Sequence, residues 1–466
     1  GRLIHMRRSF PLVGLTVLGL LACGPRGGAP GGPPSGAPSG RAAGPVVPRG
    51  TQSPTFDATP LYRQMGMLAR GTTLPLLGRV GYLASRTPDT THVVVGVSFA
   101  NSALTFKREA DNRFRASYAA SVALTRDAAS VAFEQATEEV LVGTYRETTR
   151  TDESLVHQVV LDVAPGRYTL TLTLRDESSQ RSAEERMAIV VPRLEPGSFA
   201  TPIPVAEVTA RGTRDSLPLL LMAPSGTAIA GRDSIIPLYI EAYDTTAAPL
   251  RLLLRNEQGR RLWDDTATLA KRGAMRSGVV ALPLSRIGIG VAQFSVTREA
   301  ARDTGSTFLF VGFGADLPVA TFEDMILYLR FYASPFRIAQ LRDAAPEQRP
   351  AAWAEFVRAT DPDPRTAVHE DLRNYFDRIA RANLRFREEA SAGWLSDRGR
   401  VFITLGDPDQ LFEPQLNDMS RNRQQVWVYQ GINLQLTFYD QTGTGRWRLT
   451  QSSEVRFESE YRRRLK

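Results

Sequence analysis

The stretch that decides the fold of the first half of the chain is Val163-Ala164-Pro165-Gly166-Arg167-Tyr168-Thr169-Leu170-Thr171-Leu172. Pro165-Gly166 is a turn-forming pair. After it, large apolar side chains occupy every second position, while arginine and threonine occupy the positions between them. This alternation is typical of a half-buried β-strand in an antiparallel sheet. The stretch therefore predicts a turn followed by a strand that has one face in a core.

Similar short β-rich runs lie on both sides of this stretch, with turn-forming residues between them and no helical pattern. They are expected at residues 92–99, 113–124, 139–147, 154–163, 167–175 and 186–191. Closely spaced strands of this kind favour an antiparallel β-sandwich. The Pro-Gly-x-Tyr edge at residues 165–168 is often seen in immunoglobulin-like modules. Residues 51–195 are therefore predicted to form a first sandwich of immunoglobulin-like type.

The rhythm of strands stops at a proline-rich segment, residues 192–204, and then resumes. Further strands are expected at residues 235–243, 250–255, 278–284, 290–297 and 306–312, with a hairpin turn at residues 256–259. The proline-rich segment has the composition of a linker. Residues 196–316 are therefore predicted to form a second, divergent immunoglobulin-like sandwich.

At Thr321 the apolar spacing changes from the period of a strand to that of a helix. Helices are expected from residue 321, over residues 346–359, and after Asp363, which is placed to cap a third helix with Pro364 at its first position. Gly393 is placed to end that helix. Strands are expected again at 400–405, 425–429, 432–439 and 446–450. Residues 317–466 are therefore predicted to be an α+β domain, with helices and a small antiparallel sheet.

The densest motif of the chain joins these helices to this sheet. It reads Gly393-Trp394-Leu395-Ser396-Asp397-Arg398-Gly399-Arg400-Val401-Phe402-Ile403-Thr404-Leu405-Gly406-Asp407-Pro408-Asp409. It resembles the motif of the GWxTD-domain proteins, bacterial proteins mostly of unassigned function, and the resemblance covers roughly residues 321–450. Ser396 stands where the family has threonine, and His369 stands where asparagine usually precedes Glu370. The family supplies no established catalytic residue.

Two interpretations of the motif follow from its chemistry. In the first it is a structural corner, in which Trp394 fills a seam, Ser396 or Asp397 bonds backbone amides, Arg398 clamps an acid, and Gly399 and Gly406 allow close backbone approach. The full candidate motif is Gly393, Trp394, Ser396, Asp397, Arg398, Gly399, Gly406, Asp407 and Pro408. In the second, carboxylates converge with His369 at one end of the sheet as an acid/base or hard-cation site. These carboxylates are Glu370, Asp397, Asp407 and Asp409.

The start of the chain predicts its location. Met6 is followed by Arg7 and Arg8, and then by a mostly apolar run of about a dozen residues that ends at Cys23, the layout of a secretory signal peptide. Leu20-Leu21-Ala22-Cys23 resembles the lipobox, at which bacterial lipoproteins are acylated on cysteine and cleaved before it. Residues 1–23 are therefore predicted to be a lipoprotein signal, and Cys23 the lipid-bearing residue.

A tether is predicted after the lipidated cysteine. Of the 27 residues at 24–50, nine are glycine and seven are proline, a composition that cannot bury a core. Gly24 after Cys23 favours the outer membrane in the sorting scheme that the motif resembles. The chain is therefore expected in the bacterial cell envelope, held in the membrane by the acylated Cys23 and facing the periplasm or the cell surface.

Composition excludes several function classes. Cys23 is the only cysteine, so neither disulfides nor thiolate metal sites are expected in the mature chain. Only three of the 57 basic residues are lysine, which indicates a genomic bias toward arginine, and the net charge of +8 is spread among 49 acids. Nucleic-acid binding is therefore not predicted. The chain also has no His-Glu-x-x-His, Gly-x-Ser-x-Gly or Gly-Lys-Ser/Thr motif, so no cofactor and no metal are predicted.

These observations favour a non-catalytic envelope lipoprotein whose sandwiches hold the C-terminal domain away from the membrane, where it binds another envelope protein. The alternative is an enzyme or a cation-dependent binding site on the C-terminal domain, acting on peptide or glycan. A third possibility is glycan binding by a sandwich, for which exposed aromatic side chains such as Trp263 would have to line a groove.

Overall fold

A computed structural model describes most of the chain after residue 57. The described residues are 58–71, 74–150, 154–217, 219–230, 232–244, 249–298, 304–313, 321–366, 369–388, 392–413 and 423–466. The predicted signal, Cys23 and the tether lie outside them. In the described part, no helix is both long and apolar enough to cross a membrane.

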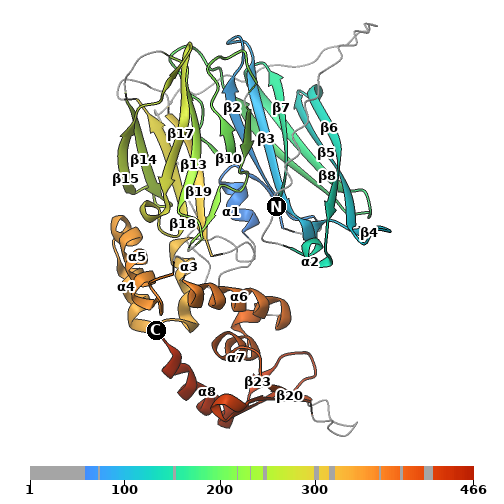
Figure 1. The fold of residues 1–466 in the computed structure, drawn as a ribbon, viewed down its shortest axis with the longest axis vertical. Coiled ribbons are helices and arrows are strands. Elements are labelled where there is room, and N and C mark those ends of the chain that lie inside the picture. The colour runs from blue at the N-terminus through green and yellow to red at the C-terminus, as the bar shows by residue number, and fades with distance from the viewer. Residues whose placement is uncertain are drawn as a thin grey trace, which may run out of the picture. The chain divides into compact units, whose positions relative to one another are not determined.

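The first sheets pack face to face around the strand predicted from residues 163–172. Sheet I has the order β6-β5-β8-β9, with β4 beside β5, and sheet II has the order β1-β2-β3-β7. Tyr168, Leu170 and Leu172 point into the core between the two sheets, as their alternation predicts. The elements are α1 (Thr59–Gln64), β1 (Leu68–Arg70), β2 (Leu76–Ala84), β3 (Thr91–Ala100), β4 (Lys107–Arg108), β5 (Phe114–Arg126), β6 (Ala129–Val142), α2 (Tyr145–Thr148), β7 (Ser154–Val163), β8 (Gly166–Asp176) and β9 (Ser182–Val191) (Figure 1).

The strand predicted over residues 139–147 is wrong in its position. β6 begins ten residues earlier, at Ala129, and ends at Val142. The chain then enters α2, whose N-terminus is capped by Thr144, because the Thr144 hydroxyl accepts a hydrogen bond from the Glu147 amide. The local capping bonds thus end the strand before Glu147.

The next strands form a second pair of facing sheets. Sheet III has the order β11-β10-β13-β17-β16, and sheet IV has the order β12-β19-β18-β14-β15. The predicted hairpin turn at residues 256–259 is confirmed, since the Gly259 amide donates to the Asn256 carbonyl between β14 and β15. The strands are β10 (Ile203–Thr209), β11 (Leu219–Met222), β12 (Thr227–Ile229), β13 (Ile235–Ala242), β14 (Leu250–Asn256), β15 (Arg261–Ala267), β16 (Lys271–Arg272), β17 (Met275–Pro283), β18 (Gly290–Thr297) and β19 (Thr304–Gly312).

Sheet II is buried on both faces, so the sheets stack in the order I, II, III, IV. In β3, Val93 and Val95 join the core shared with sheet I, whereas Val94 joins a second core with Ile203 and Met222 of sheet III. Glycine at position 81 permits this close stacking, because a Cβ atom there would lie 2.7 Å from Cδ1 of Ile203. The two sandwiches therefore share a packed interface rather than only a linker.

A buried ionic network fastens sheet III to sheet II. The Glu241 carboxylate is fully buried and accepts hydrogen bonds from the Arg211 guanidinium at 2.7 and 2.9 Å and from the Tyr239 and Tyr243 hydroxyls. Arg211 also donates to the Ala84 carbonyl at the end of β2, while the Ala84 amide donates to the Tyr243 hydroxyl. Because every charge in this network is paired, burial of the ions is compensated. We call these five residues the Glu241 junction.

The C-terminal region contains helices and a small sheet V, and its core is continuous with that of sheets III and IV. Phe313 follows β19 and stacks on Phe376 of α6, with 3.8 Å between ring centroids. Sheet V has the order β20-β21-β22-β23. The elements are α3 (Phe322–Leu327), α4 (Pro335–Asp343), α5 (Arg349–Thr360), α6 (Glu370–Arg385), α7 (Asp397–Leu405), β20 (Gln410–Phe412), β21 (Arg423–Tyr429), β22 (Leu434–Asp440), β23 (Arg448–Leu449) and α8 (Gln451–Arg464) (Figure 1).

The start and the end of the third predicted helix are wrong. This helix, α6, begins at Glu370 rather than after Asp363, which instead bonds the amide and guanidinium of Arg365. The cap of α6 is His369, whose Nδ1 accepts a hydrogen bond from the Leu372 amide at 3.1 Å. The imidazole thus does the work of a capping side chain. The helix ends at Arg385, so Gly393 does not terminate it.

The strand predicted at residues 400–405 is also wrong, because these residues belong to helix α7. Valine, isoleucine and threonine in this segment suggest a strand. Ser396 caps the helix, however, and all of its large apolar side chains are buried or half-buried, so tertiary packing and the cap override the local preference. The sandwich sheets of the N-terminal part and the helix-containing C-terminal region are otherwise as expected.

Candidate functional site

The motif begins in a tight turn against α6. Gly393 opens a 3₁₀ turn, Gly393–Leu395, and a Cβ atom at this position would lie 2.3 Å from the Ala382 carbonyl oxygen. The next amide, of Trp394, donates to Oδ1 of Asn383 at 3.1 Å. Only glycine fits this close contact between the turn and α6.

Trp394 fills the seam that the first interpretation assigned to it. Its side chain is fully buried, and its ring lies 5.6 Å from the Tyr328 ring and 5.8 Å from the Phe331 ring, measured between centroids. Tyr375 of α6 donates its hydroxyl to the Tyr328 carbonyl in the same seam. Trp394 therefore joins α6 to the segment that follows α3.

Ser396 and Gly399 form the start of α7. The Ser396 hydroxyl donates to the Gly393 carbonyl at 2.7 Å and accepts from the Gly399 amide at 3.0 Å. A Cβ atom on Gly399 would lie 1.9 Å from the same carbonyl oxygen. The serine is thus a helix cap, and the glycine is required by its contact with the turn.

Asp397 and Arg398 connect α7 to β23 and to the loop before it. Oδ2 of Asp397 accepts the Leu449 amide at 2.9 Å. Arg398 was expected to clamp an acid, but its guanidinium lies over the rings of Trp447 and Phe386, at 4.8 and 5.4 Å from their centroids. Burial lowers the pKa of Arg398 to about 10. We call residues 393–399 with these contacts the GWxTD corner.

The end of the motif is held by α6 and by sheet V. Gly406 ends α7 with a φ of +87°, a conformation that favours glycine, and Pro408 is half-buried in the segment that follows. Arg385 of α6 donates to Oδ1 of Asp407 at 2.5 Å. Asp409 accepts the Gln430 amide at 2.6 Å. Each of these polar side chains thus has a structural partner.

The structure does not bring the four predicted carboxylates together. Glu370 lies at the first position of α6, whereas Asp407 contacts Arg385 at the last, and these helix positions are about 22 Å apart at 1.5 Å per residue. His369 faces Tyr332 and Thr360 and caps its own helix. Among the described residues, no group of three His, Cys, Asp or Glu side chains is placed to hold a metal ion.

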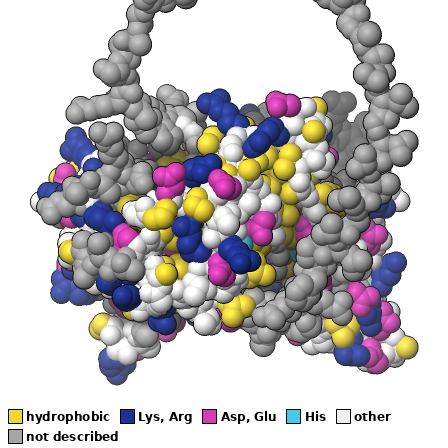
Figure 2. All heavy atoms as spheres, turned by 90° about the horizontal axis from the view of Figure 1, so that it is seen from above, with side chains coloured by type: hydrophobic (Ala, Val, Ile, Leu, Met, Phe, Trp, Pro, Cys, Tyr) yellow, Lys and Arg dark blue, Asp and Glu magenta, His cyan; other side chains and the backbone are white. Residues whose placement is uncertain are grey.

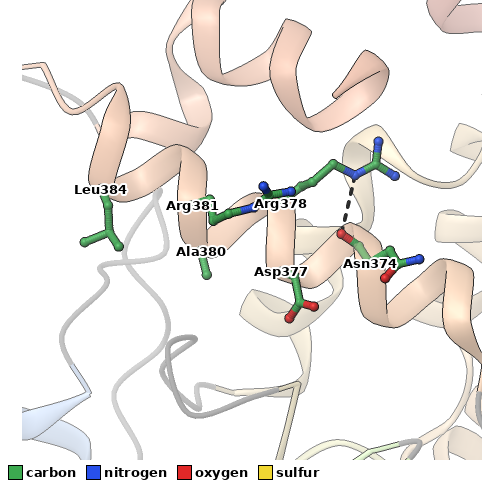
Figure 3. A pocket seen from close by; sticks show the side chains of 6 residues that line it. All are labelled: Asn374, Asp377, Arg378, Ala380, Arg381 and Leu384. Atoms are coloured by element: carbon green, nitrogen blue, oxygen red, sulfur yellow. Dashed lines mark hydrogen bonds between the residues drawn. The ribbon is translucent and has the colours of Figure 1, made fainter. Parts of the chain in front are cut away.

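Two surface hollows lie in the C-terminal region, and no pattern in the sequence indicated either of them. One, of about 400 Å³, runs along α6 and is lined by Asn374, Asp377, Arg378, Ala380, Arg381 and Leu384 (Figure 3). In it Arg378 donates to the Asn374 carbonyl, and its pKa is lowered, first by burial. All described residues that line this hollow come from one helix.

The second hollow is a groove of about 700 Å³ between β22, the turn that precedes it, and α8. Its lining is more polar and comes from the end of β21, the turn that follows it, β22 and α8, and it includes Gln435 of β22 and Arg456 of α8. Helix α8 was absent from the sequence-based prediction, because few of its residues are apolar.

On the face of the molecule drawn in Figure 2, basic and acidic side chains are interspersed rather than separated by sign.

Two solved structures that match this chain are only distantly similar to it. A chain described as "Biofilm associated protein - BSP domain" is 9% identical with a TM-score of 0.16, and the match covers 54% of each chain. A beta-glucuronidase of Ruminococcus gnavus, in complex with uronic isofagomine, is also 9% identical with a TM-score of 0.16, and 47% of this chain matches 34% of that one. The present chain thus spans about half or less of these proteins, and at such TM-scores neither likeness carries an argument.

No curated protein matches the chain. A family model, described as the GWxTD domain, matches residues 295–461. This range begins within β18 and contains the GWxTD corner, the hollow along α6 and, apart from Arg463, the lining of the groove at β22 and α8. The C-terminal part of this chain is therefore a GWxTD domain.

Proposed function

We propose that this chain is an envelope lipoprotein, anchored through an acylated Cys23, whose GWxTD domain binds another envelope protein without catalysing a reaction. In this proposal the N-terminal sheets form two immunoglobulin-like sandwiches that hold the domain away from the membrane. The observation that carries the proposal is the GWxTD corner itself. Trp394 is fully buried, Ser396 is a cap, and Asp397 bonds the Leu449 amide, so these side chains are engaged in folding.

The stacking of the sheets supports the spacer role. A spacer must resist bending, and sheet II is packed on both faces and fastened by the Glu241 junction. Interdomain interfaces that are large and apolar restrict relative motion of domains. The groove at β22 and α8 then offers the domain an open surface for recognition.

Two measurements test the proposal. Mass spectrometry of the mature N-terminus should show an acylated cysteine, and Cys23→Ser should abolish the modification and release the protein from membranes. Crosslinking in intact cells, followed by purification of the tagged full chain, should recover a stoichiometric envelope protein. Recovery of the chain alone at all crosslinker concentrations would contradict the proposed interaction.

The alternative, an enzyme or a cation-dependent site acting on peptide or glycan, has less support because its carboxylates are apart and individually bonded. A thermal shift with Ca²⁺, Mg²⁺ or Mn²⁺ discriminates between the two. For the natural chain we expect that none of the ions changes the unfolding midpoint. We expect the same of Asp397→Asn and of Asp407→Asn, each compared with itself without the ion. A metal-dependent rise that either variant removes would favour the alternative.

A further inference from the structure

The groove between β22 and α8 has a free strand edge on one side. The Val428 carbonyl of β21 accepts the Asp409 amide at 2.9 Å, so the polar backbone groups of Val428 face β20. Val428 pairs with Gln435 of β22. In an antiparallel ladder this pairing directs the N–H and C=O of Gln435 away from β21 and toward the groove.

Farther along β22 the chain covers this edge, first at Thr437, which is the next equivalent position, and then through β23, which pairs with Phe438 and Tyr439. The Thr437 amide donates to Oγ of Ser453 at 2.8 Å, and the Thr437 carbonyl accepts the Thr450 amide at 3.0 Å. Within the described residues, no group bonds to the outward N–H and C=O of Gln435. An exposed pair of this kind is what an added strand requires.

The opposite wall of the groove carries an unbalanced positive charge. One stripe of α8 presents Arg456, Ser459, Glu460 and Arg463. Glu460 pairs with Arg463 at 2.7 Å, but Arg456 is exposed and makes no ion pair with any described residue. A guanidinium binds a carboxylate through two parallel hydrogen bonds, so this wall selects an acidic ligand.

We propose that this groove binds an extended acidic peptide segment of a partner protein. The peptide backbone pairs with the N–H and C=O of Gln435, and a peptide carboxylate binds Arg456. The inference rests on the proposed role of the GWxTD domain as an interaction module and names the chemistry of its partner. A peptide fits better than a glycan, because the paired donor and acceptor match a peptide backbone and the Tyr429 ring is buried rather than offered as a stacking platform.

Fluorescence anisotropy with the full chain tests this proposal. The probe is a labelled heptapeptide that alternates valine and glutamate, compared with one that alternates valine and lysine and with an acidic one methylated at its central amide nitrogen. We expect the acidic probe to bind, and Arg456→Glu to weaken its binding at least about tenfold. Arg462→Glu is the matched control, because Arg462 lies on the same helix but does not line the groove.

A second variant tests the strand edge independently of charge. Gln435→Pro removes the outward N–H without removing a bond to β21, and proline is tolerated at a strand edge. We expect Gln435→Pro and the methylated probe each to weaken binding, with an unchanged unfolding midpoint for the variant.

Three results would overturn the inference. They are equal binding of the acidic and basic probes, unchanged binding by Arg456→Glu, and a dissociation constant above about 1 mM for the acidic probe. If the crosslinked partner is still recovered with Arg456→Glu, the groove is not the binding site, but the proposed role of the domain as an interaction module stands.

Discussion

The Glu241 junction and the GWxTD corner both fasten segments that are distant in the sequence, but they use opposite chemistry. The junction buries a complete ion pair with two tyrosine hydroxyls. The corner uses a buried tryptophan, glycine contacts and a helix cap, and its charged residues Asp397 and Arg398 are half-buried. The corner shows that a motif rich in charged residues can have a structural role. The junction shows that a buried ionic network can form where the sequence contains no recognisable motif.

The two regions should also fail differently. A buried ion pair depends on both partners, because removal of one leaves an uncompensated charge in the interior. A corner built from packing and caps should lose stability in smaller steps, one contact at a time. Substitutions at each region test this contrast directly.

The largest loss is expected from Glu241→Ala. It leaves the buried Arg211 guanidinium without its carboxylate, which costs about 3 to 5 kcal/mol in comparable buried pairs. The measurement is the free energy of unfolding from urea denaturation.

Glu184→Ala is the control for this variant, because it breaks the exposed Glu184–Arg186 pair and should change that free energy by less than about 1 kcal/mol. Similar losses in the two variants would show that the junction does not depend on its ion pair.

The second loss is expected from Gly399→Ala at the corner. The new methyl group would overlap the Gly393 carbonyl, so α7 must shift, at a cost of about 1 to 3 kcal/mol. Gly431→Ala is the matched control, since nothing lies within 4 Å of a Cβ atom there. We expect urea denaturation to separate the two alanine variants, and equal midpoints would contradict the close contact.

Ser396→Ala should have a smaller effect, about 1 kcal/mol, because it removes a single helix cap. Ser396→Thr places the residue typical of the family at this position and retains the hydroxyl. It should therefore lie closer to the natural chain in the same unfolding measurement. A threonine variant as unstable as the alanine variant would show that shape, rather than the hydroxyl, matters here.

Features set by short-range sequence patterns could be predicted from the sequence, both in the first sandwich and at the corner. The alternation of Tyr168, Leu170 and Leu172 identified a strand, and the motif indicated that Trp394 fills a seam. These features depend on neighbours in the chain. The helix at residues 400–405 was missed because its β-branched residues favour a strand, and only the capping residue Ser396 favours a helix.

The stacking of the two sandwiches could not be predicted in the same way. Its one local signal is the nearly continuous apolar run of β3, which is typical of a strand buried on both faces. Arg211 and Glu241 are 30 residues apart, and nothing in their spacing relates them to Ala84. The groove at Gln435 was likewise hidden, because it depends on how α8 lies along β22.

The smallest effect concerns pH and sharpens the contrast within one strand. In β7, Gln158 bonds the Leu220 carbonyl and the Met222 amide of sheet III, whereas His157 packs against Tyr118 inside the first sandwich. Burial lowers the pKa of His157. His157 therefore binds a proton less readily in the folded state than in the unfolded chain, where the pKa of histidine is about 6.5. Stability from the neutral imidazole is present above that pH and is lost as the pH falls below it.

We expect the urea midpoint of the natural chain to decrease when the pH is lowered from 7.5 to 5.5, and the midpoint of His157→Gln to decrease less. Because Gln158 does not titrate, Gln158→Leu should lower stability at both pH values and leave the slope unchanged. A pH slope that is the same in His157→Gln as in the natural chain would assign the acid sensitivity to other groups.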